Sequence, residues 1–296
     1  MAIYAAREPR EPDGKDDLTV RNNTRTKGGV LCDPLKPIKG RYNDLIVYAI
    51  INQKGGVGKS TTAAALWAGL NLKGYKTLAI DLDPQCNLSY TAGADTAHKT
   101  SLSLLTGENP AADTIQHTAT GDFIAASKNL AGADAFITDT GKEYRLRESL
   151  EPLSGLYDYV IIDTPPALGI LTVNALTACN RVIIPAQAAV FSLQGIDQLN
   201  QTIQPVKKYC NPALTIEGIL LTRFNARTIA ARDIAAYTEQ LAAKLGTKVF
   251  TATIREGIAI EEAQLSNQNI FEYAPKANVT NDYRAFIDEL LEGVYK

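Results

Sequence analysis

A short stretch rich in glycine and lysine holds the residues best suited to chemistry in this chain. It reads Lys54-Gly55-Gly56-Val57-Gly58-Lys59-Ser60-Thr61. Glycines allow backbone N–H groups to converge on an anion, and the N-terminus of a following helix adds partial positive charge. In such a loop Lys59 would reach the β- and γ-phosphates of a nucleotide, and the Ser60 hydroxyl would bind Mg²⁺. The spacing therefore predicts a phosphate-binding site.

The residues on either side of this loop predict the elements that must position it. The apolar run before the loop, 46–51, is rich in β-branched residues, which is typical of a strand buried on both faces. The alanine- and leucine-rich run after it, 63–70, favours a helix. Strand, glycine loop and helix in this order are the context that a phosphate-binding loop requires.

The loop departs from the standard G-x-x-x-x-G-K-[ST] pattern at its start. Gln53 stands where the first glycine would fall, and a second lysine, Lys54, follows it. This arrangement resembles the deviant Walker A loop of the ParA/MinD class of ATPases. The resemblance implies that residues 54–61 bind ATP, and that Lys54 crosses a dimer interface to the nucleotide of the partner.

Two aspartates follow the next apolar run, in Leu78-Ala79-Ile80-Asp81-Leu82-Asp83. Because side chains alternate along a strand, Asp81 and Asp83 should point to the same side, where carboxylates suit Mg²⁺ and water positioning. The stretch resembles a ParA-family motif. This implies that Asp83 orients the attacking water, which makes Lys54, Lys59 and Asp83 the catalytic residues, and that Asp81 is a supporting metal-site carboxylate. Cys86 stands where the family usually has glycine, and we expect a packed residue rather than a reactive thiol.

A third apolar run, 159–163, ends in Asp163 and is followed by Pro165 and Pro166. This is the Walker B pattern, in which Asp163 should hold a Mg²⁺-bound water near Ser60. The predicted metal site therefore consists of Ser60, Asp81 and Asp163.

Apolar strands alternate with helical stretches from residue 46 onward, which predicts an α/β P-loop NTPase fold with a mainly parallel twisted sheet and helices on both faces. The predicted strands are Ile46–Asn52, Thr77–Asp81, Asp122–Ala126, Tyr159–Asp163, Arg181–Pro185, Ile216–Leu221 and Lys248–Ala252. The predicted helices include Ser60–Leu72, Arg145–Leu150, Gly195–Lys208 and Arg227–Leu245.

Length and composition indicate one ATPase domain, 45–296, after a polar extension, 1–44, that we expect to be flexible. The net charge of −2 provides no general attraction to nucleic acid, so DNA binding would need a local patch. No apolar run reaches the roughly 18 residues that a membrane span needs. The four cysteines lack metal-ligand spacing, which favours reduced thiols in a cytoplasmic protein.

The resemblance to the ParA/Soj branch extends from residue 46 to the C-terminus. It implies an ATP- and Mg²⁺-dependent homodimer that binds nonspecific double-stranded DNA on the nucleoid. It also implies slow ATP hydrolysis, stimulated by a ParB-type centromere-binding protein, in the partitioning of a plasmid, chromosome or mobile element.

Basic residues near the C-terminal third are the candidates for contacts with DNA phosphates. They are Arg223, Arg227, Arg232 and Lys276. Arg255 is a candidate for the adenine side of the nucleotide or for DNA. The family commonly has I-P-R-N-V-R near this position, and here the proline and asparagine are missing and Ala259 replaces the second arginine.

Three alternatives remain open at this point. A MinD-like membrane-associated ATPase would use its C-terminal helix, and the apolar positions from Tyr283 to Val294 have helical spacing. The opposite face carries Asp282, Asp288, Glu289 and Glu292, which acidic lipids would repel, so we expect this helix to dock on the core of the protein. An iron–sulfur ATPase would need cysteines in other motifs. A non-enzymatic, nucleotide-switched DNA-binding regulator is the third alternative.

Overall fold

A computed structural model describes residues 45–187 and 190–294, and of residues 190–194 and 294 it describes the backbone only. The predicted extension, 1–44, lies outside these residues. Its flexibility and the domain boundary after it therefore stay predictions.

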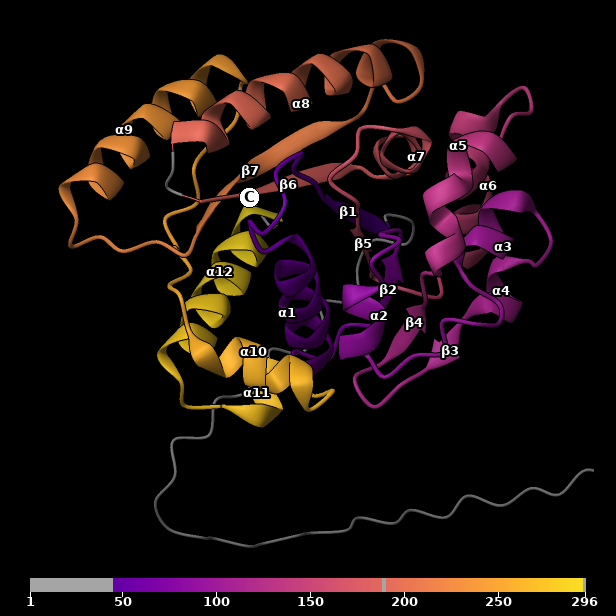
Figure 1. The fold of residues 1–296 in the computed structure, drawn as a ribbon, viewed down its shortest axis with the longest axis horizontal. Helices are drawn as coiled ribbons and strands as arrows, with labels where there is room; N and C mark the ends of the chain where they lie inside the picture. The colour runs from indigo at the N-terminus through magenta and orange to yellow at the C-terminus, as the bar shows by residue number, and fades with distance from the viewer. Residues whose placement is uncertain (1–44, 188–189, 295–296) are drawn as a thin grey trace, which may run out of the picture. The chain divides into compact units, whose positions relative to one another are not determined.

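The centre of the described chain is a seven-stranded sheet in the order β3-β4-β2-β5-β1-β6-β7 (Figure 1). All neighbouring strands are parallel except β3 and β4. The strands are β1 Ile46–Ile50, β2 Thr77–Asp81, β3 Gln116–His117, β4 Asp122–Ile124, β5 Tyr159–Asp163, β6 Arg181–Gln187 and β7 Thr215–Thr222. The predicted α/β fold with a mainly parallel sheet is confirmed.

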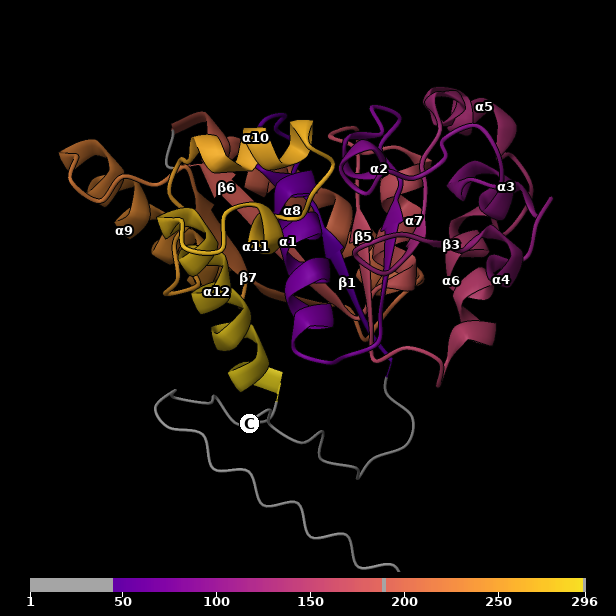
Figure 2. The same cartoon turned by 90° about the horizontal axis from the view of Figure 1, so that it is seen from below.

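Helices cover both faces of the sheet because the strands are apolar on both sides. Val47 and Ala49 of β1 belong to one buried cluster, and Tyr48 and Ile50 belong to the other. Figures 1 and 2 show α1, α10, α11 and α12 on one face and α7 and α8 on the other.

The four predicted helices correspond to α1, α6, α8 and α9, with bounds within two residues except that α8 begins five residues earlier than predicted. The α-helices are α1 Lys59–Leu72, α2 Asn87–Thr91, α3 Ser101–Thr106, α4 Ala111–Thr114, α5 Ala133–Phe136, α6 Arg145–Leu150, α7 Ile170–Ala178, α8 Val190–Tyr209, α9 Ile229–Lys244, α10 Ile258–Leu265, α11 Ile270–Tyr273 and α12 Asn278–Val294. Three short 3-10 helices are η1 Lys128–Gly132, η2 Lys142–Tyr144 and η3 Glu151–Leu153. No helix of the described ranges is long and apolar enough to span a membrane.

The predicted strand Lys248–Ala252 is wrong. The segment makes one isolated parallel bridge between Val249 and Ile219 of β7. Beyond it the Glu289 carboxylate accepts the backbone N–H groups of Thr251 and Ala252, at 2.9 and 2.8 Å. These two N–H groups therefore cannot donate to β7 as they would in a paired strand. The segment covers the edge of β7 without extending the sheet.

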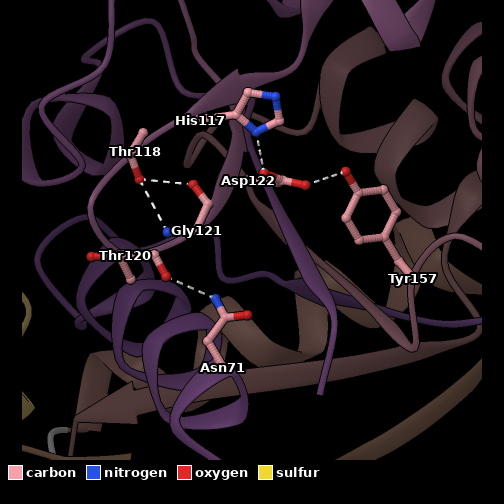
Figure 3. A network of polar contacts seen from close by, with 7 residues as sticks. All are labelled: Asn71, His117, Thr118, Thr120, Gly121, Asp122 and Tyr157. Carbon is pink, nitrogen blue, oxygen red and sulfur yellow. Dashed lines mark hydrogen bonds and ion pairs between the residues drawn. The ribbon is translucent and has the colours of Figure 1, made fainter. Parts of the chain in front are cut away.

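The short antiparallel strand β3 was not predicted, and Figure 3 shows the polar contacts that hold it. The turn before β4 closes through the Thr118 hydroxyl, which bonds to the carbonyl oxygen and the N–H of Gly121, at 2.9 and 3.3 Å. At the strand itself, Asp122 contacts both the His117 ring and the Tyr157 hydroxyl at 2.6 Å. The Asp122–Tyr157 contact joins distant segments, and the others lie within a hairpin whose first strand has two residues, too few for hydrophobic periodicity to reveal.

Helix α12 docks on the core, as its apolar spacing predicted. Five of its large apolar side chains are at most 8% exposed, namely Tyr283, Phe286, Ile287, Leu290 and Leu291. A Cβ added at Gly69 of α1 would lie 2.2 Å from Ile287, so the two helices pack closely.

The acidic face of α12 also makes contacts within the protein. Asp282 pairs with Arg255 and Asp288 pairs with Lys73, while Glu289 accepts the two backbone bonds described above. The acidic face, predicted to repel acidic lipids, therefore also helps to hold the helix on the protein.

Candidate nucleotide site

The glycine loop runs from the end of β1 into the first turn of α1. Gly56 and Gly58 have φ of 74° and 85°, a left-handed conformation in which a Cβ is unfavourable. Gly58 is the N-cap of α1, and its carbonyl accepts the Thr62 N–H at 2.9 Å. The N–H groups of the first turn lack partners within a helix, so they are available to an anion.

Polar side chains at the carboxyl ends of β1, β6 and β7 hold this loop in place. Asn52 accepts the Lys54 N–H at 2.9 Å and donates to the Pro185 carbonyl at 2.7 Å. Gln187 donates to the Gly56 carbonyl at 3.0 Å, and the Thr222 hydroxyl donates to the Val57 carbonyl at 2.8 Å. Sequence reasoning missed these supports. The sequence feature that could have revealed them is a polar residue at, or just after, the end of each strand that leads to the loop.

The loop forms one wall of a cavity of about 740 Å³, which we call the nucleotide cavity. Its lining includes seven residues predicted for nucleotide binding or catalysis, namely Gly55, Gly56, Gly58, Lys59, Ser60, Thr61 and Asp83. Val57 is wholly buried beneath the loop and Lys54 is half-buried at its start. Two large apolar side chains at the rim, Tyr90 and Leu265, are 52% and 86% exposed.

Asp163 lies beneath the nucleotide cavity because β5 is the neighbour of both β1 and β2. Its Cα pairs with that of Ile50 on one side and that of Asp81 on the other. The side chain is wholly buried, Oδ1 accepts the Thr164 N–H at 3.1 Å, and Oδ2 has no hydrogen-bond partner among the described residues. Burial raises the pKa of Asp163 well above its usual range, as does the charge of Asp81, while Ser60 and Lys59 oppose that rise.

Lys59 carries the complementary charge at this position. Its side chain is buried, which lowers the pKa of the ammonium group, and the carboxylates of Asp163 and Asp83 counteract that shift. An anionic phosphate beside Lys59 would supply further negative charge to this partly desolvated cation.

The residues at this position fit Mg²⁺. A buried carboxylate oxygen without a partner is costly, and the Oδ2 atom of Asp163 is such an oxygen. Within residues 45–187 and 190–294, no cluster of three or more acidic, histidine or cysteine side chains could hold a metal by itself. Mg²⁺ usually binds through one or two protein groups, waters and substrate phosphates, and Ser60 and Asp163 match that requirement.

Asp81 is held by hydrogen bonds within the protein. Its carboxylate accepts the Asp83 N–H at 2.9 Å and the Ser89 N–H and hydroxyl at 2.9 and 2.7 Å. Complete burial raises the pKa of Asp81 to about 6, against the lowering effect of these bonds. In this structure Asp81 positions the segment that carries Asp83, and its predicted part in metal binding stays a prediction.

Asp83 faces the nucleotide cavity from the turn after β2. It is 5% exposed, and its Oδ1 accepts the Gln85 N–H at 2.9 Å. That bond fixes the side chain relative to its own turn. The geometry leaves a carboxylate on the cavity wall, as its predicted role in orienting water requires.

Cys86 is wholly buried in this turn and has a left-handed φ of 57°. Burial raises the pKa of its thiol to about 11. Relative to an unperturbed thiol, the thiolate fraction at pH 8 falls by about a hundredfold. We expect brief treatment with iodoacetamide at pH 8 to modify the half-buried Cys210 much faster than Cys86, measured by peptide mass spectrometry. Equal rates in the folded protein, with unfolded protein as the reference, would contradict this expectation.

Three arginines line a second cavity of about 400 Å³, which we call the arginine cavity. Arg223, Arg227 and Arg255 share it with Glu256 and Asp282. Arg255 forms two ionic hydrogen bonds to Asp282, at 2.7 and 2.8 Å. The structure therefore brings two of the predicted DNA-binding residues, Arg223 and Arg227, together with Arg255.

Two further predicted DNA-binding residues lie elsewhere. Arg232 is exposed on α9 and Lys276 is exposed between α11 and α12, and neither lines the arginine cavity. A third, smaller cavity of about 170 Å³ continues from Gly58 and Thr61 toward Ile254, Gly257 and Tyr283. We call it the base-side cavity, after the predicted adenine-side position of Arg255. Arg255 lines this base-side cavity as well, which is compatible with its predicted adenine-side position.

Comparison with known proteins agrees with this geometry. A family model described as an AAA domain matches residues 45–216. The chain is 38% identical to the chromosome partitioning protein ParA of Caulobacter vibrioides over 256 residues, 84% of this chain and 95% of that protein. It is 37% identical to the sporulation initiation inhibitor protein Soj of Bacillus subtilis over 242 residues, 80% of this chain and 94% of that protein.

Among solved structures, the cobyrinic acid a,c-diamide synthase of Mycobacterium smegmatis with bound ADP and magnesium matches with a TM-score of 0.74 at 33% identity. The match covers 86% of this chain and 96% of that one. The fold and the loop thus define a P-loop ATPase. At the level of sequence, the chain belongs to the ParA/Soj family of partition ATPases.

Proposed function

We propose that the chain is a Mg²⁺-dependent ATPase that partitions a plasmid, a chromosome or a mobile element. ATP promotes a homodimer, the dimer binds double-stranded DNA without sequence preference, and slow hydrolysis releases it. A ParB-type centromere-binding protein stimulates that hydrolysis, and the protein acts on the nucleoid in the cytoplasm. The observation that carries the proposal is the nucleotide cavity, which Lys59, Ser60 and Asp83 line, together with the electrostatic interactions of these three residues with the buried Asp163.

In this proposal each residue at the cavity has an electrostatic or positioning role. The N–H groups of the glycine loop and Lys59 bind phosphate oxygens, and Asp83 orients a water for attack. Ser60 and Asp163 would hold Mg²⁺, which would neutralise charge between the phosphates when bound. Lys54 would stabilise charge on the nucleotide of the partner. No covalent intermediate is needed.

The exposed rim of the nucleotide cavity supports a dimer that closes over the nucleotide. Tyr90 and Leu265 are large apolar side chains exposed beside the glycine loop, and a partner chain that closed over the nucleotide would bury them. The docked α12 favours this proposal over a MinD-like membrane ATPase, because its apolar face is already buried.

The arginine cavity supports a surface for DNA phosphates. Arg223 and Arg227 form no ion pair with any described acidic side chain, whereas Arg255 is already paired with Asp282. Contacts of this kind bind the DNA backbone without reading bases.

Size-exclusion chromatography with light scattering measures the molar mass of the protein and so tests whether ATP promotes a dimer. We expect the D83N variant, in which hydrolysis is slow, to elute with Mg²⁺ and ATP at twice the monomer mass of 32.0 kDa. With ADP, or with Lys54 also replaced by alanine, it should elute as a monomer. The same mass in every condition would contradict an ATP-dependent dimer in which Lys54 contributes to the interface.

A further inference from the structure

Arg223 is held in an unusual position directly after β7. Its backbone has a left-handed φ of 48°, a conformation that is unfavourable for a non-glycine residue. The residues on both sides are anchored, because Thr222 bonds to the Val57 carbonyl of the glycine loop and the Phe224 N–H bonds to the Ile254 carbonyl at 2.9 Å. The surrounding structure therefore maintains the strained conformation, and the side chain is exposed.

The conformation places Arg223 where three cavities meet. Among the described residues it alone lines the nucleotide cavity, the base-side cavity and the arginine cavity. Arg227 lines the arginine cavity but neither of the other two. Of the two arginines in the arginine cavity that form no ion pair with a described acidic side chain, only Arg223 therefore also lines the nucleotide cavity.

The charge of Arg223 is suited to a nucleotide ligand. A guanidinium remains protonated at all relevant pH values and presents several N–H donors in a fixed plane. Phosphate oxygens and ribose hydroxyls are both acceptors for such donors. Arg255, the other arginine at the base-side cavity, is engaged with Asp282 through both its Nε and a terminal nitrogen.

We propose that Arg223 contacts the nucleotide bound in its own chain, a role beyond the contacts with DNA phosphates considered above. This assignment rests on the proposed nucleotide-binding function. The guanidinium donates to acceptors of the ribose–phosphate part of the nucleotide from the wall that separates the nucleotide cavity from the arginine cavity. Because that wall is shared, bound nucleotide fixes the position of one cation of the arginine cavity.

Isothermal titration calorimetry with the non-hydrolysable analogue AMPPNP, in Mg²⁺ and without DNA, tests this assignment. The R223Q variant removes the charge but keeps a long polar side chain, and we expect it to bind AMPPNP about tenfold more weakly, or about 1.4 kcal/mol. The R223K variant should recover part of the loss. R147Q is the matched control, since Arg147 is an exposed arginine on α6 away from the cavities, and it should bind as the wild type does.

Thermal unfolding without nucleotide checks that R223Q is folded. Affinity of folded R223Q within twofold of the wild type would overturn the assignment, and so would an equal loss in R147Q. A wild-type chain that fails to bind AMPPNP would instead contradict the proposed function itself, which distinguishes the two failures.

Discussion

Replacing Asp83 by asparagine is expected to slow ATP hydrolysis by about 10²–10⁴-fold while ATP binding persists. Asparagine keeps an oxygen that can accept the Gln85 N–H, so the turn should be retained, and only the carboxylate charge is lost. Asp83 lines the nucleotide cavity, and the hydrogen bond that its carboxylate accepts within the described residues comes from Gln85, outside the glycine loop. The variant should therefore accumulate in its ATP-bound form.

Release of phosphate at saturating ATP and Mg²⁺ measures this effect, with calorimetric titration of AMPPNP reporting binding separately. D95N is a suitable control because Asp95 is an exposed acidic residue outside the nucleotide cavity. Hydrolysis by D83N at more than a tenth of the wild-type rate would contradict the role proposed for Asp83. Full biological activity of a D83A variant would instead favour the alternative of a non-enzymatic, nucleotide-switched DNA-binding regulator.

Replacing Phe286 by alanine is expected to reduce the free energy of unfolding by about 3–5 kcal/mol. Phe286 of α12 is fully buried, and its ring packs edge-to-face against Phe250 with the centroids 5.0 Å apart. Removing it leaves a cavity between α12 and the sheet. Urea unfolding of the nucleotide-free protein measures the loss as a lower transition midpoint.

Tyr237 provides the matched control, since it is an aromatic residue of α9 that is 52% exposed. Its replacement by alanine should change stability by no more than about 0.5 kcal/mol. A loss below about 1 kcal/mol for F286A would mean that α12 contributes little to the fold. In that case a helix that leaves the core to lie on a membrane would become the better interpretation.

Much of the nucleotide site could be predicted because its signals are local. The glycine loop is defined by its own spacing, and the strands that end in Asp81 and Asp163 are apolar runs of the correct length. A parallel sheet brings the carboxyl ends of such strands to one edge, so the motifs meet without further information. The docking of α12 was predictable for the same reason, from helical spacing of apolar residues.

What could not be predicted depends on contacts between distant segments. Asn52, Gln187 and Thr222 support the glycine loop through bonds to residues up to 165 positions away. Glu289 accepts the N–H groups of Thr251 and Ala252, so the pairing with β7 stops after Val249. Hydrophobic periodicity in the sequence does not indicate these bonds. The hydrogen bonds from Ser89 to Asp81 and from Arg255 to Asp282 likewise become visible only in the folded structure.

Binding to a nonspecific DNA duplex is the measurement that tests the central proposal most directly. It should be made without nucleotide, with ADP and with ATP, for the wild type and the K54A variant, across a series of salt concentrations. We expect binding only for the wild type with ATP, with an affinity that falls steeply as salt rises, because Lys and Arg contacts release counterions from the phosphates. Binding that does not depend on nucleotide, or no binding in any condition, would contradict the account.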